Sequence, residues 1–483
     1  MIVLASLLMC ALGIAIVLSL WKTPLRFSPG AVLAASLGIG AGIGLSSCVY
    51  FLLLAAGAGR WTVVAIETAL VAAAAAGAWY IKAFDFPPED RTDNPGILII
   101  GPFLLAFVIA AGALIISFGI NREGVWDAWA IWNLHARYLF RGGPEFWHNA
   151  FNYTNQWAHP DYPLMLPAAV ALCWTIAGVE SALGPQLVAI LFALATLGVL
   201  TGVIAVLRGR TQALLAGTLL LGTAYFVQMT ASEYADVPLA FYVLATLALF
   251  ALQDRSPADL RFTALAGVMA ALAAWTKNEG LLFLAVSLIG RALALFRYRG
   301  KREMLRQMPA AVVGALPVLA VVAFFKLHYA PANDVMAHVS AAQFGRNVID
   351  PSRYLLTLES LAVQLFHLGQ FLIPILLVLA VYAWLVRLKV DEPGRASLGT
   401  LVTILGLMLL GDLAVYIFLS PFDLHFHLDN SMDRLLLQLW PAAILTFFTL
   451  VATPVVSAPA VSKKAAPKPP TKTAPAHQRK SKR

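Results

Sequence analysis

Charged side chains stand directly beside long apolar runs at several places in this chain. Asp127 follows the fourth run in VWDAWAIWNLHARYLF, Glu233 and Asp236 open a later run in SEYADVPL, and Lys277 and Glu279 lie between two runs in WTKNEG. Charged groups at membrane depth are costly, so those that occur there are functional candidates. A carboxylate in such a place can act as a general base on a hydroxyl group, and a lysine can bind a phosphate.

Two further polar segments extend this set. AHPDYPL contributes His159, Asp161 and Tyr162, and the late segment PFDLHFHLDNSMDRLLLQLWP contributes Arg434. An arginine offers a bidentate fork that suits phosphate. The combination favours transfer from a phosphate leaving group to a hydroxyl acceptor. Neither common Gly-rich nucleotide-binding loop is present on the side expected to be cytoplasmic, so a lipid phosphate is the expected donor.

Two histidines of the late segment, His425 and His427, are candidate metal ligands. Being two residues apart, they would project to one side of an extended strand. A zinc site needs three or four ligands, so the others, Asp236 among them, would come from other loops. A divalent metal ion is therefore the one cofactor that the sequence suggests.

Each of these groups also has an ordinary structural interpretation. Asp236 precedes Val237 and Pro238, where a carboxylate commonly caps a helix. Lys277 and Glu279 can form a surface ion pair, which stabilises little. The tryptophans of the loop before residue 163 can form an interfacial belt or a platform for a sugar. What favours function is that separate loops bring these groups to one membrane face.

The composition defines the class of protein that must position these residues. The 483 residues are 60% hydrophobic and 12% charged, against roughly 45–50% and about 25% in soluble proteins. About fourteen apolar runs recur from Met1 to Val456, most of them long enough to cross a bilayer core of about 30 Å. The run 163–180 is short and begins with Pro163, so we expect it to be re-entrant or to lie on the membrane surface. An all-α polytopic protein with about thirteen transmembrane helices is predicted.

Lysine and arginine set the predicted orientation, because short loops rich in these residues stay in the cytoplasm. With 163–180 not crossing, the N-terminus is expected in the periplasm, the C-terminus in the cytoplasm and the loop 121–162 outside, with a juxtamembrane helix in its first half. Much of the net charge of +9 comes from the end of the chain. The Pro, Ala and Lys composition of 457–483 predicts a disordered cytoplasmic tail, not a nucleic-acid partner.

The order of the motifs resembles a known family. Its elements are WDAWAIWNLHARYLF, HPDYPLMLP, SEYADVPLAFY, the KNEG turn and the late DRLLLQLWP. This order is similar to that of the GT-C superfamily of membrane glycosyltransferases. The closer likeness is to the bacterial dolichyl-phosphate-mannose-protein mannosyltransferase-like group, which includes the aminoarabinose transferases of lipid A and the lipopolysaccharide transferases of rhizobia. The resemblance covers residues 96–445.

The resemblance implies roles for individual residues. Asp127 matches the acidic residue of the family's first loop and is the expected catalytic base. Asp236, helped by Glu233, matches the second acidic position, which supports the site or a divalent metal. A catalytic region is thus expected over 96–456, preceded in 1–95 by three additional transmembrane helices with no assigned role.

The donor phosphate is expected to contact a different set of residues from that of the relatives. At the position of His159–Pro163 the relatives carry a Lys-Pro-Pro element that contacts the lipid phosphate, and the lysine is absent here. Lys277 and Arg434 are therefore the expected phosphate partners. The other side chains expected at the site are His159 and Tyr162, as further phosphate contacts, and Asp161 and Glu279, as supports.

The resemblance thus implies an inverting glycosyltransferase of the bacterial inner membrane. It would move a sugar from a polyprenyl phosphate to a hydroxyl of a cell-envelope glycolipid, glycan or protein at the periplasmic face. A transporter or flippase of lipid-linked sugars is one alternative, although such proteins usually show paired repeats and no internal repeat is found. A surface-glycan polymerase or ligase is the other, and an oligosaccharide on the lipid would distinguish it.

Overall fold

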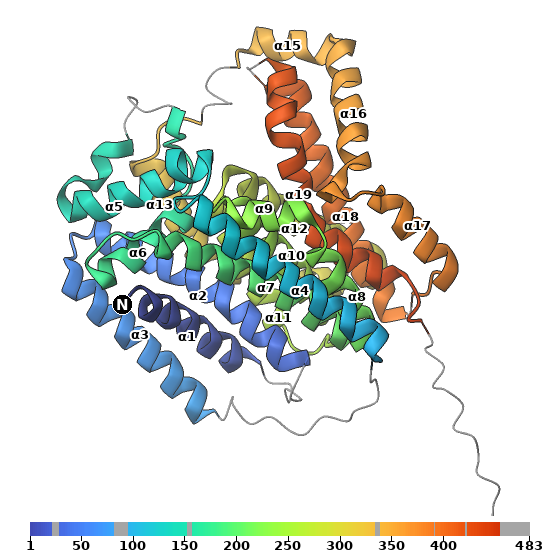
Figure 1. The fold of residues 1–483 in the computed structure, drawn as a ribbon, viewed down its shortest axis with the longest axis horizontal. Coiled ribbons are helices and arrows are strands. Elements are labelled where there is room, and N and C mark those ends of the chain that lie inside the picture. Colours follow the sequence, from blue (N-terminus) through green and yellow to red (C-terminus); the bar gives the residue numbers. More distant parts are fainter. Residues whose placement is uncertain are drawn as a thin grey trace, which may run out of the picture. The chain divides into compact units, whose positions relative to one another are not determined.

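The computed structural model describes residues 1–21, 29–81, 95–151, 157–333, 339–390, 392–420 and 423–454. These residues form helices, and the one β-contact among them is an isolated bridge between Leu388 and Val451. In chain order (Figure 1) the helices are α1 (Ile2–Leu20), α2 (Pro29–Ala55), α3 (Arg60–Tyr80), α4 (Ile97–Ile120), η1 (Ala128–Trp132), α5 (Asn133–Phe146), η2 (Trp147–Phe151), α6 (Met165–Ala177), α7 (Leu183–Arg208), α8 (Arg210–Leu221), α9 (Ala224–Ala231), α10 (Asp236–Arg255), α11 (Arg261–Thr276), α12 (Asn278–Arg299), α13 (Lys301–His328), α15 (Ala341–Ile349), α16 (Pro351–Phe366), η4 (Leu368–Gln370), α17 (Ile375–Val386), α18 (Glu392–Ala414), η5 (Val415–Leu419) and α19 (Leu424–Leu450).

The helices confirm an all-helical polytopic membrane protein. In the described part of the chain, 9 helices are long and apolar enough to cross a membrane, or up to 11 if each of two bent pairs is one span. These pairs are α8 with α9, bent by 61°, and α16 and η4 with α17, bent by 76°. The predicted count of about thirteen is not confirmed.

Two apolar runs form helices that are short for a span. The runs 163–180 and 262–275 form α6 and α11, of 13 and 16 residues. At 1.5 Å per residue they extend about 20 Å and about 24 Å, less than the bilayer core of about 30 Å. For α6 this agrees with the expectation that 163–180 does not cross. Its side chains are buried in the protein, however, so α6 is not a helix resting on a membrane surface.

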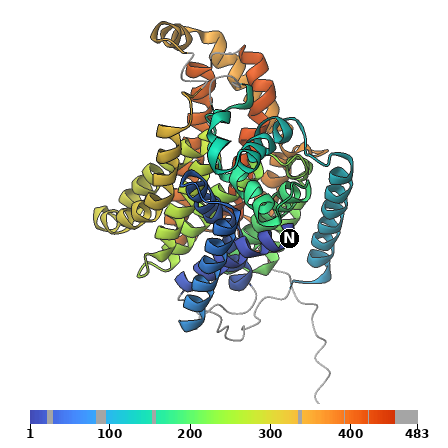
Figure 2. The same ribbon diagram turned by 90° about the vertical axis from the view of Figure 1, so that its left-hand side faces the viewer.

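Helix α10 lies at the centre of the bundle and carries Asp236 at its first position. The apolar stretch of this helix is entirely buried, and the helix packs against α7, α11, α18 and α19. By contrast, only 6% of the apolar stretch of α4 is buried, and this helix lies at the edge of the bundle, where it packs against α8 and α9 (Figure 2). A helix apolar on every side is expected in either place, since both lipid and protein interior accept apolar side chains.

The first two helices pack tightly within the same compact unit as the rest, Met1–Thr453. Gly38 and Gly42 lie four residues apart on one face of α2, and Gly13 of α1 meets them there. A Cβ atom on Gly42 would lie 1.9 Å from the carbonyl oxygen of Met9. Small residues at this spacing let helix backbones approach closely in membranes.

A valine at Gly42 should therefore separate α1 from α2. We expect Gly42→Val to lower the free energy of unfolding by about 1–3 kcal/mol, as overpacking generally does. The measurement is thermal unfolding of the purified protein in detergent. The matched control is Gly112→Val in α4, where a Cβ would meet nothing within 4 Å. Equal shifts for the two variants would contradict the close packing.

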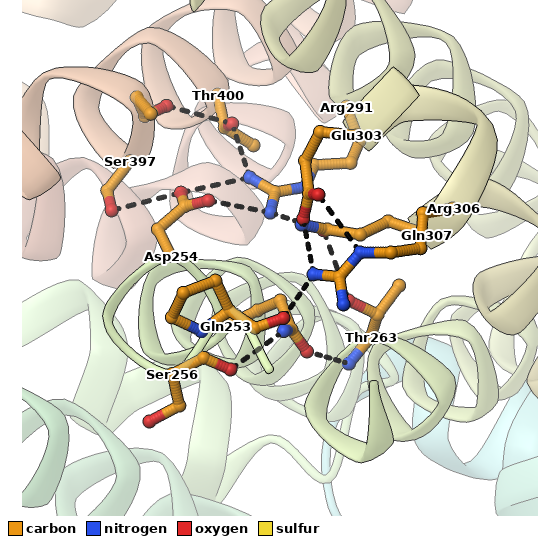
Figure 3. A network of polar contacts seen from close by, with 12 residues as sticks. Gln253, Asp254, Ser256, Thr263, Arg291, Glu303, Arg306, Gln307, Ser397 and Thr400 are labelled. Atoms are coloured by element: carbon orange, nitrogen blue, oxygen red, sulfur yellow. Dashed lines mark hydrogen bonds and ion pairs between the residues drawn. The ribbon is translucent and has the colours of Figure 1, made fainter. Parts of the chain in front are cut away.

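A buried ion pair joins four helices at the end of α10 opposite Asp236 (Figure 3). The guanidinium of Arg291 is fully buried, and it donates to both carboxylate oxygens of Asp254 at 2.8 and 3.0 Å. It also donates to Gln307 at 2.8 Å and to Thr400 at 2.9 Å. The four residues come from α12, α10, α13 and α18, the helices that carry site residues at their other ends. Because breaking such a pair strands a buried charge, the network fixes how these helices sit together.

Candidate active site

Five charged side chains from separate parts of the sequence form one continuous chain of ion pairs. An Nη2–Oδ2 distance of 2.7 Å joins Arg434 to Asp127, and one of 2.8 Å joins it to Asp236. The Nζ atom of Lys277 lies 3.2 Å from Oδ1 of Asp236 and 2.9 Å from Oε1 of Glu279. The structure thus brings together four residues predicted as catalytic or phosphate-binding, and Glu279 as a neighbour.

Asp236 is the buried centre of this chain. Its side chain is 0% exposed, and besides the two cations it accepts a 2.6 Å hydrogen bond from Nε2 of Gln438. The capping interpretation is wrong, because the N-cap of α10 is Ala235 and the Asp236 carboxylate contacts side chains of other elements. Gln438 was not predicted, since an amide inside an apolar helix gives no signal of its partner. A buried carboxylate is tolerated when cations and donors satisfy it in this way.

Lys277 is buried as well, with only 5% of its side chain exposed. It stands in extended conformation between α11 and α12. Burial by itself disfavours the charged ammonium, yet the carboxylates of Asp236 and Glu279 outweigh this and raise the pKa of Lys277. The predicted ion pair with Glu279 exists, but the surface interpretation of it is wrong.

Asp127 is positioned by the loop that precedes α10. Its backbone N–H donates to the hydroxyl of Tyr234 at 3.3 Å, and the N–H of Val125 donates to the carbonyl of Ser232 at 3.3 Å. The Tyr234 ring also lies under the Arg434 guanidinium at 4.8 Å. The Asp127 side chain is 16% exposed, so it is not closed off from the surface of the protein.

A π-helical turn, η1, follows Asp127 directly and leads into α5. Such turns insert an extra residue into a helix and occur frequently at functional sites. The predicted helix after Asp127 is confirmed, although its first turn is π-helical. The π-helical turn could not be predicted from the spacing of apolar residues, because one inserted residue changes that spacing too little.

Glu233 contacts the start of α5, the helix that follows Asp127 and η1. Its Oε2 accepts from Nδ2 of Asn133 at 2.9 Å, and its Oε1 has no hydrogen-bond partner among the described residues. Burial raises the pKa of Glu233 to about 8, against a usual 4.5. The folded protein therefore holds this carboxyl protonated at neutral pH.

The raised pKa makes the stability depend on pH. The Glu233 carboxyl binds its proton more tightly in the folded state than in the unfolded state. Its contribution to the free energy of unfolding is therefore greatest below pH 4.5 and falls as the pH rises to about 8. The loss is up to about 1.4 kcal/mol per pH unit in that window. Thermal unfolding between pH 5 and 9 should show a flatter dependence in Glu233→Gln, which mimics the protonated acid. An identical pH dependence in both proteins would contradict the assignment.

The AHPDYPL segment lies in a second polar cluster. Oδ2 of Asp161 accepts from Nδ2 of Asn278 at 2.7 Å and from Nδ2 of Asn333 at 2.9 Å, and the ammonium of Lys326 donates to the backbone carbonyl of Asp161. Lys326 also donates to Oδ1 of Asn278 at 2.8 Å. Lys326 was not predicted, although a lysine that ends the apolar run of α13, between FF and LHY, is a signal of function.

The two other predicted residues of this segment form an aromatic stack. The rings of His159 and Tyr162 lie 4.8 Å apart at 16°, and Trp132 stacks with Tyr162 at 5.6 Å and 24°. Trp132 is buried, as is Trp147, whereas Trp126, Trp129 and Trp157 are exposed. The loop tryptophans therefore divide between core and surface.

A cavity of about 490 Å³ connects the two clusters. Tyr162, Asn278 and Lys326 line it from the second cluster, and Glu279 lines it from the end of the ion-pair chain. Asp412 of α18 also lines it. Asp412 was not predicted, although an acidic residue inside an apolar run is by itself a signal of function.

His425 and His427 do not form the predicted pair. They lie in the first turn of α19, not in an extended strand, so they point about 200° apart around the helix. Nδ1 of His427 lies 2.8 Å from the hydroxyl of Ser420. In the described part of the chain, no three His, Cys, Asp or Glu side chains come together as metal ligands. Because cations and an amide already occupy both oxygens of Asp236, these residues do not fit a metal.

The fold and the site define a multi-pass helical membrane protein with a charged site at the loop ends of its central helices. Residues 161–326 match the family described as dolichyl-phosphate-mannose-protein mannosyltransferase, a GT-C family domain. The resemblance to GT-C glycosyltransferases is thus confirmed over this segment, which includes Asp236 and Lys277 and leaves out Asp127 and Arg434. No curated protein and no solved structure matches the chain.

Proposed function

We propose that this protein transfers a glycosyl group from a polyprenyl-phosphate donor to a hydroxyl acceptor of the cell envelope, at the periplasmic face of the bacterial cytoplasmic membrane. The observation that carries the proposal is the ion-pair chain, which joins a partly exposed carboxylate to two cations beside a GT-C domain. A carboxylate can take the acceptor proton, and cations can stabilise a departing phosphate.

The reaction is an inverting displacement. The carboxylate of Asp127 accepts the proton of the acceptor hydroxyl while that oxygen forms a bond to the anomeric carbon. The bond between the anomeric carbon and the phosphate oxygen breaks, and the polyprenyl phosphate leaves with the electron pair. Arg434 and Lys277 face the charge that develops on this leaving group.

The charge balance of the site suggests how donor and base are coupled. Three carboxylates, those of Asp127, Asp236 and Glu279, share the two cations Arg434 and Lys277. A donor phosphate must therefore compete with a carboxylate for a cation. Asp127 is the more exposed partner of Arg434, at 16% against 0% for Asp236, so the phosphate displaces Asp127 and frees it to act as a base.

The direct test is transfer of radiolabelled sugar by the purified protein in lipid. A panel of polyprenyl-phosphate monosaccharides serves as donor and a membrane extract as acceptor. Transfer of label to the extract supports the proposal and identifies the sugar. Binding of labelled lipid without transfer would overturn it, and movement of the lipid across the bilayer would then identify a flippase. Transfer only from an oligosaccharide-bearing lipid would identify a polymerase or ligase.

Lys277 should contribute to donor binding. Lys277→Gln keeps a donor toward Asp236 and removes the charge, so we expect capture of the polyprenyl phosphate to fall by about 10- to 100-fold, the value of a hydrogen bond to a charged group. The matched control is Arg299→Gln, which removes an exposed cation at the far end of α12. Equal capture by Lys277→Gln and by the parent protein would remove Lys277 from the phosphate site.

A further inference from the structure

The cavity of about 490 Å³ is amphipathic and has a defined polar side. Carboxyl and amide side chains line it at the start of α12 and the end of α18, and leucines line it one turn further along α12 and on η5 and α19. A cavity of this size accommodates a small-molecule ligand. Its two kinds of lining suit a molecule with a polar head and an apolar tail.

The polar side presents hydrogen-bond acceptors without partners. Asp412 is 5% exposed and makes no hydrogen bond with any residue that the structure describes. Oε2 of Glu279 is buried and likewise has no partner within the described ranges. A buried acceptor without a donor costs free energy. Both carboxyl groups therefore favour a ligand that brings hydroxyl donors.

Lys326 lines the cavity, where its ammonium donates to Asp161 and Asn278. Arg434 and Lys277, the proposed phosphate partners, do not line it. With two carboxyl groups facing inward, the cavity disfavours an anionic head group such as a phosphate. It therefore differs in chemistry from the Arg434 end of the ion-pair chain.

We propose that this cavity binds a neutral glycolipid, with its sugar hydroxyls donating to Asp412 and Glu279 and its tail lying along Leu281, Leu282 and Leu435. Tyr162 and Tyr416 also line the cavity. The inference goes beyond the proposed function, because Asp127, the proposed base, does not line this cavity. The donor is the phosphate-bearing lipid, and it binds elsewhere.

The test is photolabelling of the full-length protein in lipid nanodiscs with an octyl glucoside that carries a diazirine in its alkyl chain. Labelled peptides are mapped by mass spectrometry, with octyl glucoside and octyl phosphate as competitors at equal concentration. We expect label on α12 and α19 beside the cavity, displaced by octyl glucoside and not by octyl phosphate. Equal displacement by octyl phosphate would overturn the inference, as would label spread evenly over the lipid-facing helices.

Two variants make the result specific. Leu282→Trp fills the cavity and should lower labelling at least tenfold, whereas Leu293→Trp, on an exposed part of the same helix, should leave it unchanged. Asp412→Asn keeps the shape and should weaken octyl glucoside competition about three- to tenfold, the value of a hydrogen bond or two. Unchanged labelling in both Leu282→Trp and Asp412→Asn would overturn the inference.

Photolabelling requires no turnover, so its outcome is independent of the proposed function. If the labelling is as expected but the protein shows no transferase activity, the glycolipid site is supported and the proposed enzyme activity is contradicted. Active transfer without cavity labelling would support the enzyme and overturn this glycolipid site.

Discussion

Replacing Asp127 with asparagine is expected to lower the rate of glycosyl transfer by about 10²- to 10⁴-fold, the usual contribution of a general base. Asparagine has nearly the same shape, so the backbone bond from residue 127 to the Tyr234 hydroxyl is retained. The amide cannot accept a proton from the acceptor hydroxyl. It also leaves Arg434 with one carboxylate fewer, so donor capture should be equal to or tighter than that of the parent protein.

The two readouts together separate catalysis from folding. Transfer is measured as initial rate with saturating donor, and capture is measured with labelled polyprenyl phosphate on the same preparation. The matched control is Asp429→Asn, an exposed acid on α19, which should behave like the parent protein. Substantial turnover by Asp127→Asn would exclude Asp127 as the base, and loss of both transfer and capture would indicate a structural role instead.

Replacing Asp236 with leucine is expected to have the largest effect on stability, about 3–5 kcal/mol, because it leaves charges buried without a partner. Arg434 and Lys277 both contact this carboxylate, and Lys277 is 5% exposed. The amide of Gln438 loses its acceptor as well. Such a loss is a large share of the 5–15 kcal/mol by which domains are usually stable.

A second substitution tests whether charge is the cause. In Asp236→Leu with Lys277→Met, one stranded cation is removed, so part of the lost stability should return, and the effects of the two substitutions should not add. The free energy of unfolding is measured by thermal unfolding in detergent for Asp236→Leu, for Lys277→Met and for the double variant. Asp429→Leu is the control for loss of an exposed acid. Additive losses would mean that Asp236 and Lys277 act independently and that the ion-pair chain contributes no coupling.

The class of protein follows from the sequence, because apolar length is a local property. Bilayer thickness requires long apolar runs, and these read directly from the chain. The candidate residues also follow from local rules, since Asp127, Asp236 and Lys277 are charges beside apolar runs.

The spans were harder to count than to recognise. The run 359–386 reads as one apolar stretch, yet its helices bend by 76° around η4. Gly369 and Gln370 there have positive φ angles of 75° and 60°, which end a helix without changing hydropathy. A bend of this kind depends on what packs around it, and hydropathy carries no such information.

Only the tertiary structure decided which charge meets which. The contact of Asp127 with Arg434, and that of Asp161 with Lys326, joins residues far apart in sequence, and no periodicity relates such positions. The pairing of Asp236 with two cations rather than with a helix end was likewise undetermined, because capping and ion pairing use the same carboxylate. The sequence by itself determined the membrane class of the protein and showed that Asp127, Asp236 and Lys277 are charges beside apolar runs. The packing of α10 against α11 and α19 decided their partners, since electrostatic contacts act over a few ångströms that only the folded chain defines.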